Sequence, residues 1–266
     1  MVKMDGVYIA KKRDGSIYYR SSVTYKRKHI SLGSYNTPEK AHHAYLEAVS
    51  ILRGGKRPSL NDFDDILNLS FEKWVVLINF RDNNVYFSTP IYVRPHFFYY
   101  YYSQDVILKF DVDDLFYYAS HKIMKRGGHY FVADFGMQVN ILNRYGIKNY
   151  AVIGRDYSFR NHDNTDFRRE NLEIHNKYHG VHIVSGKTGP RYRAFIHVNG
   201  NYLIGTYKSM EEAAIAYNKA IDILKSNGST KNYTPNYLEN ITAGTYADIY
   251  TCLPVSDKLQ KIYFSE

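Results

Sequence analysis

The chain of 266 residues carries 35 Lys and Arg against 26 Asp and Glu, a formal net charge of +9, and 16% of its residues are aromatic. This length fits two or three modest domains, and the apolar content excludes a disordered chain. Its one cysteine, Cys252, excludes an internal disulfide and a thiolate metal cluster.

The positive charge is unevenly distributed along the chain. Residues 1–55 hold ten basic and four acidic residues, 56–120 six and nine, 121–178 ten and six, and 179–228 six and three. Separate basic blocks suit local contacts with a polyanion. The N-terminal segment lacks the apolar run of a signal peptide, and no stretch is long enough to cross a bilayer. We therefore expect a cytoplasmic protein with no membrane partner.

Residues 1–55 predict three antiparallel strands followed by a helix, the first module. The strands are the segments 6–12, 16–25 and 28–35, with a turn at Asp14-Gly15. The helix has Thr37 as N-cap and Pro38 at its first position, and it stops at Gly54. Its apolar residues recur at helical spacing: Ala41, Ala44, Tyr45, Ala48, Ile51 and Leu52. Small alanines let this helix lie close against one face of the sheet.

Residues 56–120 are an acidic, aromatic connecting region with no recognisable site. Alternation over 77–93 predicts a hairpin around Asn83-Asn84, and 111–124 is expected either to begin a short helix or to lead into the next domain. The run FFYYYY at 97–102 would be an aggregation hazard if it were exposed. We expect a buried strand there, or a surface that a partner covers, in preference to a role in stacking on nucleic-acid bases.

Residues 121–178 are predicted to form a separate basic domain, with a helix over 138–147. A basic scaffold of this kind can grip a phosphate backbone. Its basic residues include Lys122, Lys125, Arg126, Arg144, Lys148, Arg155, Arg160, Arg168 and Arg169.

Residues 179–228 repeat the first module. Strands are expected over 180–185, 191–198 and 201–207, and Ser209 with Glu212 forms a capping box for a helix that stops at Gly228. Without a gap, 30–52 and 202–224 are identical at nine positions: Gly33/Gly205, Tyr35/Tyr207, Glu39/Glu211, Ala41/Ala213, Ala44/Ala216, Tyr45/Tyr217, Ala48/Ala220, Ile51/Ile223 and Leu52/Leu224. This predicts two copies of one fold. The tail, 229–266, should pack across the domains or form an oligomer contact.

The sheet face opposite the helix is the candidate binding surface of each module. A small antiparallel sheet fits the DNA major groove, where Arg pairs with guanine and Lys contacts phosphate. Ordinary solvated strand charges are the alternative interpretation. The candidate DNA-binding residues are Tyr8, Lys11, Lys12, Tyr19, Arg20 and Lys28 in the first module, and His182, Lys187, Arg191 and Arg193 in the second.

Both copies carry Gly-Val, then Tyr-Arg, then Gly-Ser/Thr-Tyr, then Glu-x-Ala-x-x-Ala-Tyr. This pattern resembles the Apetala-two/ethylene-response-factor (AP2/ERF) DNA-binding domain in its prokaryotic and phage form, over about two fifths of the chain. The resemblance implies that the sheet enters the major groove and that Arg20 and Arg193, on the second strand, read bases. Tyr8 and His182 stand where the family often has arginine, which alters the expected base preference.

The segment 155–175 resembles an HNH-type endonuclease motif, which often accompanies such modules in phage homing enzymes. Asp166 and Asn171 stand where that pattern places them, but Ser158 and Phe159 replace its two histidines. HNH cleavage needs an imidazole to deprotonate water and ligands for a divalent cation. We therefore expect a degenerate ββα domain with no catalytic residue, no metal and no cofactor. The neighbouring histidines His162 and His175 would restore activity only through a rearranged site.

The expected fold class is α+β, with two three-stranded antiparallel sheet-plus-helix modules (1–55 and 179–228) flanking the central ββα domain. The leading hypothesis is a nucleoid-associated, sequence-specific double-stranded DNA-binding protein, a transcriptional regulator of a phage or mobile element. Two modules on one chain would read a bipartite site. The second hypothesis is a homing endonuclease with an unorthodox site, and the third is a protein-interaction or anti-defence module. The sequence leaves the oligomeric state open.

Overall fold

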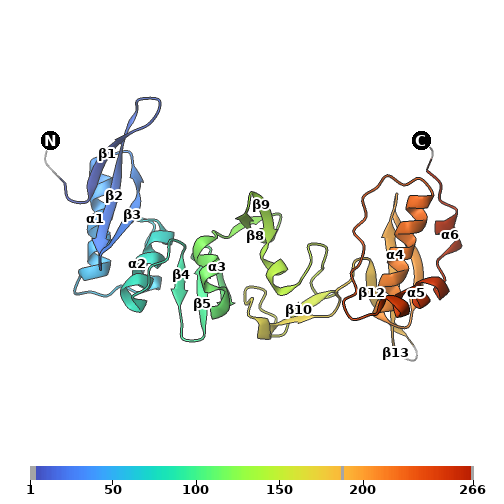
Figure 1. The fold of residues 1–266 in the computed structure, drawn as a ribbon. Helices are drawn as coiled ribbons and strands as arrows, with labels where there is room; N and C mark the ends of the chain where they lie inside the picture. The colour runs from blue at the N-terminus through green and yellow to red at the C-terminus, as the bar shows by residue number, and fades with distance from the viewer. Residues whose placement is uncertain (1–3, 187–188, 265–266) are drawn as a thin grey trace. The chain divides into compact units, whose positions relative to one another are not determined.

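The computed structural model describes residues 4–186 and 189–264 (Figure 1). The chain divides into two compact units, Met1–Ile141 with Asp163–Asn171, and Leu142–His162 with Leu172–Glu266. Its described strands form four three-stranded sheets and one two-stranded sheet, all antiparallel. The predicted α+β class is confirmed. Among the described residues, no helix is both long enough and apolar enough to span a bilayer.

The first module lies in the first unit. Its strands are β1 (Val7–Lys11), β2 (Ile17–Tyr25) and β3 (Lys28–Tyr35), paired in that order and followed by α1 (Pro38–Arg53). The Thr37 side chain accepts a hydrogen bond from the backbone N of Lys40, as an N-cap does. The core forms where Val23, Ile30 and Leu32 of the sheet meet the alanine face of α1. The sheet, the helix and both helix ends agree with the prediction.

The rest of the first unit joins helices to two small sheets. It contains η1 (Leu60–Asp62), α2 (Phe71–Asn83), β4 (Ile91–Val93), β5 (Phe97–Tyr101), β6 (Ile107–Asp111), η2 (Val112–Asp114), α3 (Leu115–Ser120), β7 (Met124–Arg126), β8 (His129–Asp134) and β9 (Met137–Asn140). Strands β4–β6 form one sheet and β7–β9 another. The aromatic run is a buried strand, since Phe98 and Tyr100 of β5 are 0% and 1% exposed. The short helix expected within 111–124 is α3.

The predicted hairpin over 77–93 is wrong. Helix α2 begins after the N-cap Ser70 and ends at Asn84, which adopts a left-handed conformation with φ of 59°. All seven residues from Trp74 to Phe80 are buried, so the helix has no polar stripe that would reveal its period. Asn79 is the polar member of this run, and its amide oxygen accepts a hydrogen bond from the Val93 backbone N at 3.0 Å. This bond ties α2 to the β4–β6 sheet.

The helix predicted over 138–147 is also wrong. This stretch continues β9 and then forms a 3-10 helix, η3 (Ile141–Tyr145). Further on come β10 (Tyr157–Phe159), η4 (Arg169–Asn171) and β11 (Leu172–Ile174). Across 121–178, all of which the structure describes, there is no α-helix, so the expected ββα arrangement lacks its helix. The segment 121–178 is divided between the two units.

The second module and the tail lie in the second unit. The sheet is β12 (Val181–Gly186), β13 (Gly189–His197) and β14 (Asn201–Tyr207), and α4 (Met210–Ser226) follows it. Ser209 and Glu212 form the predicted capping box. The tail contains α5 (Ala243–Cys252) and α6 (Asp257–Gln260), and it packs on this module through Tyr233, Val255 and Leu259, all of which are buried. Figure 1 shows the tail beside α4.

Candidate nucleic-acid interface

The two modules have the same strand register. In the first, Arg20 of β2 lies opposite Tyr8 of β1 and Ser34 of β3. In the second, Arg193 of β13 lies opposite His182 of β12 and Thr206 of β14. The β-bulge also recurs, between Ser21 and Ser22 in one copy and between Ala194 and Phe195 in the other. Sequence identity in the repeat therefore corresponds to identity of strand pairing.

A glycine holds this bulge in each copy. The carbonyl oxygen of Gly6 accepts a hydrogen bond from the Ser22 backbone N at 3.0 Å, and that of Gly180 accepts one from the Phe195 backbone N at 2.7 Å. Both glycines have positive φ, +74° and +72°. A Cβ at either position would lie 2.2 Å or 2.6 Å from the ring of the repeated helix tyrosine, Tyr45 or Tyr217. The Gly-Val motif thus fixes the strand β2 or β13 against the module's own helix.

The outer face of the first sheet centres on Arg20. Side chains alternate along a strand, so Tyr8, Tyr18 and Arg20 lie on the face opposite α1. The Arg20 guanidinium donates a hydrogen bond from Nη2 to the Tyr18 hydroxyl at 2.8 Å and lies 5.5 Å from the centre of that ring. Tyr8 is 57% exposed, and Arg20 is exposed as well. Lys12 is exposed in the β1–β2 turn.

Three candidates of the first module lie elsewhere, which corrects the prediction that they share the outer face. Lys11 and Tyr19 alternate with Tyr8 and Arg20, so the register directs them to the side of the sheet that carries the helix. Lys28 pairs with Tyr25, and its Nζ lies 4.9 Å from the centre of the Tyr86 ring. A cation that packs on an aromatic ring beside the core does not point away from it.

The outer face of the second sheet is partly apolar. Arg191 and Arg193 alternate with buried or half-buried residues and so share this face with His182. Burial, and to a lesser extent the charge of Arg155, lowers the pKa of His182, so its ring is neutral at pH 7. Phe195 lies beside it, with ring centres 4.9 Å apart. Lys187 lies outside the described residues.

Sequence reasoning missed two apolar residues on this second face, Phe195 and Leu203. They lie opposite each other across β13 and β14, and Leu203 is 44% exposed. Alternation within 191–198 carried the signal, because Ala194 and Ile196 are buried and the residue between them must face outward. The missed pair makes the second face chemically different from the first.

The HNH-like residues of the second unit form a hairpin. Strands β10 and β11 pair Ser158 with Glu173, and the Ser158 Oγ lies 2.8 Å from Nε2 of His175. Phe159 is 6% exposed and its ring packs 5.9 Å from that of Tyr157. At the position where the motif has a histidine, this chain has a buried aromatic side chain in a structural contact.

The motif's aspartate belongs to the first unit and is occupied by structural contacts. Both Asp166 carboxylate oxygens accept hydrogen bonds from Arg168, at 2.9 Å and 2.7 Å, and Lys109 Nζ lies 3.7 Å away. Burial opposes ionisation of Asp166, but the hydrogen bonds and charge of Arg168, with Lys109, hold its pKa below the usual value. Asn171 donates to the Asp166 carbonyl oxygen at 2.8 Å. These contacts stabilise the 163–171 loop and hold it against Lys109 of β6.

Within residues 4–186 and 189–264, no three His, Cys, Asp or Glu side chains gather in a way that could hold a metal ion. The outer faces of the two modules are the places where exposed arginines recur at equivalent positions. Comparison of the chain with known protein families, curated proteins and solved structures finds no match.

Proposed function

We propose that the protein binds double-stranded DNA in a sequence-specific manner through the outer sheet faces of its two modules. One observation carries the proposal. Arg20 and Arg193 occupy the same register position of the central strand, on the sheet face opposite the helix, and both are exposed. The same exposed arginine occurs in both modules, together with the same core residues. Because nothing in the core requires that charge, a role for the arginine in recognition is favoured over a role in packing.

The surroundings of Arg20 prepare it to read a base. Its hydrogen bond to Tyr18 uses one of the five guanidinium donors and limits the rotation of a long side chain. The remaining donors can meet guanine O6 and N7 in the major groove, the commonest specific contact to DNA. An arginine that is already restrained loses less conformational entropy on binding.

The two faces differ in a way that predicts different half-sites. Tyr8 and Ser34 flank Arg20, whereas His182, Phe195 and Leu203 surround Arg193. Apolar side chains in the major groove contact the methyl group of thymine, and polar ones contact donors or acceptors on base edges. The second module should therefore prefer a thymine next to its guanine, while the first module should not.

The test uses single arginine variants and charge-matched controls. Arg20→Ala and Arg193→Ala each remove one cation from an outer face. Lys40→Ala and Lys225→Ala remove one cation from the exposed side of α1 and α4. Binding of a duplex recovered from random DNA is measured by fluorescence anisotropy. A lost base contact costs about 1–3 kcal/mol, or roughly a 5- to 150-fold rise in Kd.

The controls separate base reading from general attraction. Lys40 and Lys225 lie on the helix side, away from the proposed DNA-binding faces, so their loss should leave the affinity and the salt dependence nearly unchanged for every sequence. Arg20→Ala should instead weaken the selected duplex much more than a scrambled one. Equal affinities of wild type, Arg20→Ala and Arg193→Ala for the selected duplex would remove these arginines from the interface and end the proposal.

A further inference from the structure

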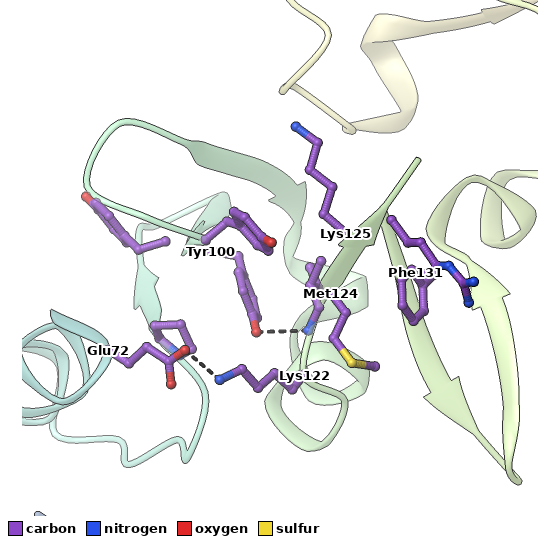
Figure 2. Close-up of a pocket in the computed structure, with 11 residues that line it drawn as sticks. Glu72, Tyr100, Lys122, Met124, Lys125 and Phe131 are labelled. Atoms are coloured by element: carbon purple, nitrogen blue, oxygen red, sulfur yellow. Dashed lines mark hydrogen bonds and ion pairs between the residues drawn. The ribbon is translucent and has the colours of Figure 1, made fainter. Parts of the chain in front are cut away.

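The first unit contains a pocket that the proposed function does not use. It has a volume of about 550 Å³ and lies between the end of β5 and the strand β7 (Figure 2). Tyr100, Tyr101 and Tyr102 form one wall, and the segment Lys122–Arg126 with Phe131 forms another. Pockets of roughly 300–1,000 Å³ are the usual size for small-molecule and cofactor sites. The FFYYYY run, which the modules do not use, supplies three of the eleven described residues that line it.

The charge of the pocket is positive. Glu72 is the single carboxylate among the described residues that line it, and Lys122 holds it in an ion pair (Figure 2). Lys125 and Arg126 then remain as cations, both exposed to solvent. Lys125 Nζ lies 4.9 Å from the centre of the Tyr130 ring, a contact that leaves its charge intact. The pocket therefore attracts an anion.

The aromatic wall offers ring surface, most of whose exposed part belongs to Tyr102. The Tyr100 side chain is almost fully buried, and its oxygen accepts a hydrogen bond from the Ile123 backbone N at 3.0 Å (Figure 2). Burial raises the pKa of Tyr100 to about 12, so the hydroxyl keeps its proton at neutral pH. Tyr102 packs edge-on against Tyr130, with ring centres 5.5 Å apart, and is only half-buried. A planar group could lie against these rings.

We propose that this pocket binds a nucleotide, with its phosphate attracted by the positive charge of Lys125 and Arg126 and its base against the half-buried ring of Tyr102. Cations and aromatic rings in one pocket suit a ligand that is both anionic and planar. A neutral sugar would leave the cations without partners, and an apolar ligand would bury them at a cost. Base stacking on aromatic side chains contributes about 1–3 kcal/mol per base. The ligand is either a free nucleotide or an unpaired nucleotide of a strand.

The test measures binding by calorimetry to five probes: deoxyadenosine monophosphate, deoxyadenosine, inorganic phosphate, phenyl phosphate, and a single-stranded oligonucleotide of ten deoxyadenosines. All titrations use the full chain with Arg20→Ala and Arg193→Ala, so that the module faces contribute little. A negative result for DNA binding by the modules can therefore be distinguished from a negative result for nucleotide binding by the pocket. Two pocket variants are made in this background: one with both Lys125→Ala and Arg126→Ala, and one with Tyr102→Leu. Lys40→Ala is the matched control.

The monophosphate should bind at least tenfold more tightly than deoxyadenosine or phosphate alone. The Lys125/Arg126 pair of changes should weaken the monophosphate at least tenfold and deoxyadenosine little, whereas Tyr102→Leu should weaken both. An oligonucleotide that binds more tightly than the monophosphate identifies a strand as the source, and equal affinity identifies a free nucleotide. The proposal is overturned if no probe binds, if the pocket changes leave affinity unaltered, or if phenyl phosphate binds as tightly as the nucleotide.

Discussion

Replacing Gly180 with alanine tests whether the Gly-Val motif holds the bulge that directs Arg193. The new Cβ would lie 2.4 Å from the Phe195 carbonyl oxygen and 2.6 Å from the Tyr217 ring, closer than real Cβ contacts occur. The positive φ of +72° costs an L-residue about 1–2 kcal/mol. Displacing a backbone carbonyl and a buried ring costs about 1–3 kcal/mol more. Together these predict a loss of about 2–5 kcal/mol in the second module.

Hydrogen exchange reads this loss locally, within the module concerned. A factor of ten in exchange corresponds to about 1.4 kcal/mol, so the amides of α4 should exchange about 30-fold faster or more. Gly200→Ala is the control in the same module, because a Cβ there meets no atom within 4 Å and its φ is not positive. Wild-type protection of α4 in Gly180→Ala would refute the reasoning. Equal effects of both changes would refute it as well.

Three further predictions concern pH, the central loop and DNA cleavage. Burial raises the pKa of Tyr35, Tyr100, Tyr207, Tyr217 and Tyr250 to about 12. Unfolded tyrosine ionises near pH 10, so the free energy of unfolding that depends on these protonated tyrosines is complete below pH 10 and is lost as the pH rises to about 12. Circular dichroism should follow the resulting unfolding. Asp166→Asn should cost the first unit about 1–3 kcal/mol by weakening its pairing with Arg168, and limited proteolysis should then cut within 163–171 while leaving the wild type intact. With Mg²⁺ or Mn²⁺ the protein should leave its bound duplex uncut, since Phe159 cannot deprotonate water; nicking that disappears in His162→Ala or His175→Ala would contradict this.

Both modules could be predicted from the sequence because each local signal agreed with the next. Thr37-Pro38 and the Ser209/Glu212 capping box mark the two helix starts, and the structure places both helices there. The alanine spacing marks the face that meets the sheet. The repeat added independent support, since each pattern occurs twice at the same distances. Sequence patterns that span a few residues and occur twice can be interpreted correctly without any knowledge of tertiary contacts.

The failures occurred where tertiary burial overrides local pattern. Helix α2 reads as alternating strand because its residues 74–80 are buried on every side, and only Ser70 and Asn84 at its ends report a helix. The stretch 138–147 has apolar residues at helical spacing, but its first part pairs with β8 and forms a strand. Periodicity describes exposure, and it is uninformative where a segment is buried all round or joins a sheet edge.

The sequence predicted which residues belong to the candidate strands, but not which face of the sheet each side chain occupies. Arg20 and Tyr8 lie on the outer face as expected, while Lys11 and Lys28 do not. A side chain's face depends on strand register, and a shift of one residue moves it to the other side. The bulge beside Ser22 introduces such a shift within one strand pair. Alternation alone separates Lys11 from Tyr8 within one strand, whereas the face of Lys28 on the third strand depends on the register and its bulge.

The most direct test of DNA recognition is selection from a pool of random duplexes. Wild-type protein should enrich a two-part site in which one half carries a guanine and the other a guanine next to thymine. The variant with both Arg20→Ala and Arg193→Ala, run in parallel, should enrich neither half. Recovery of no preferred duplex by the wild type, or of the same site by the variant, would contradict the proposal that these two sheet faces read DNA.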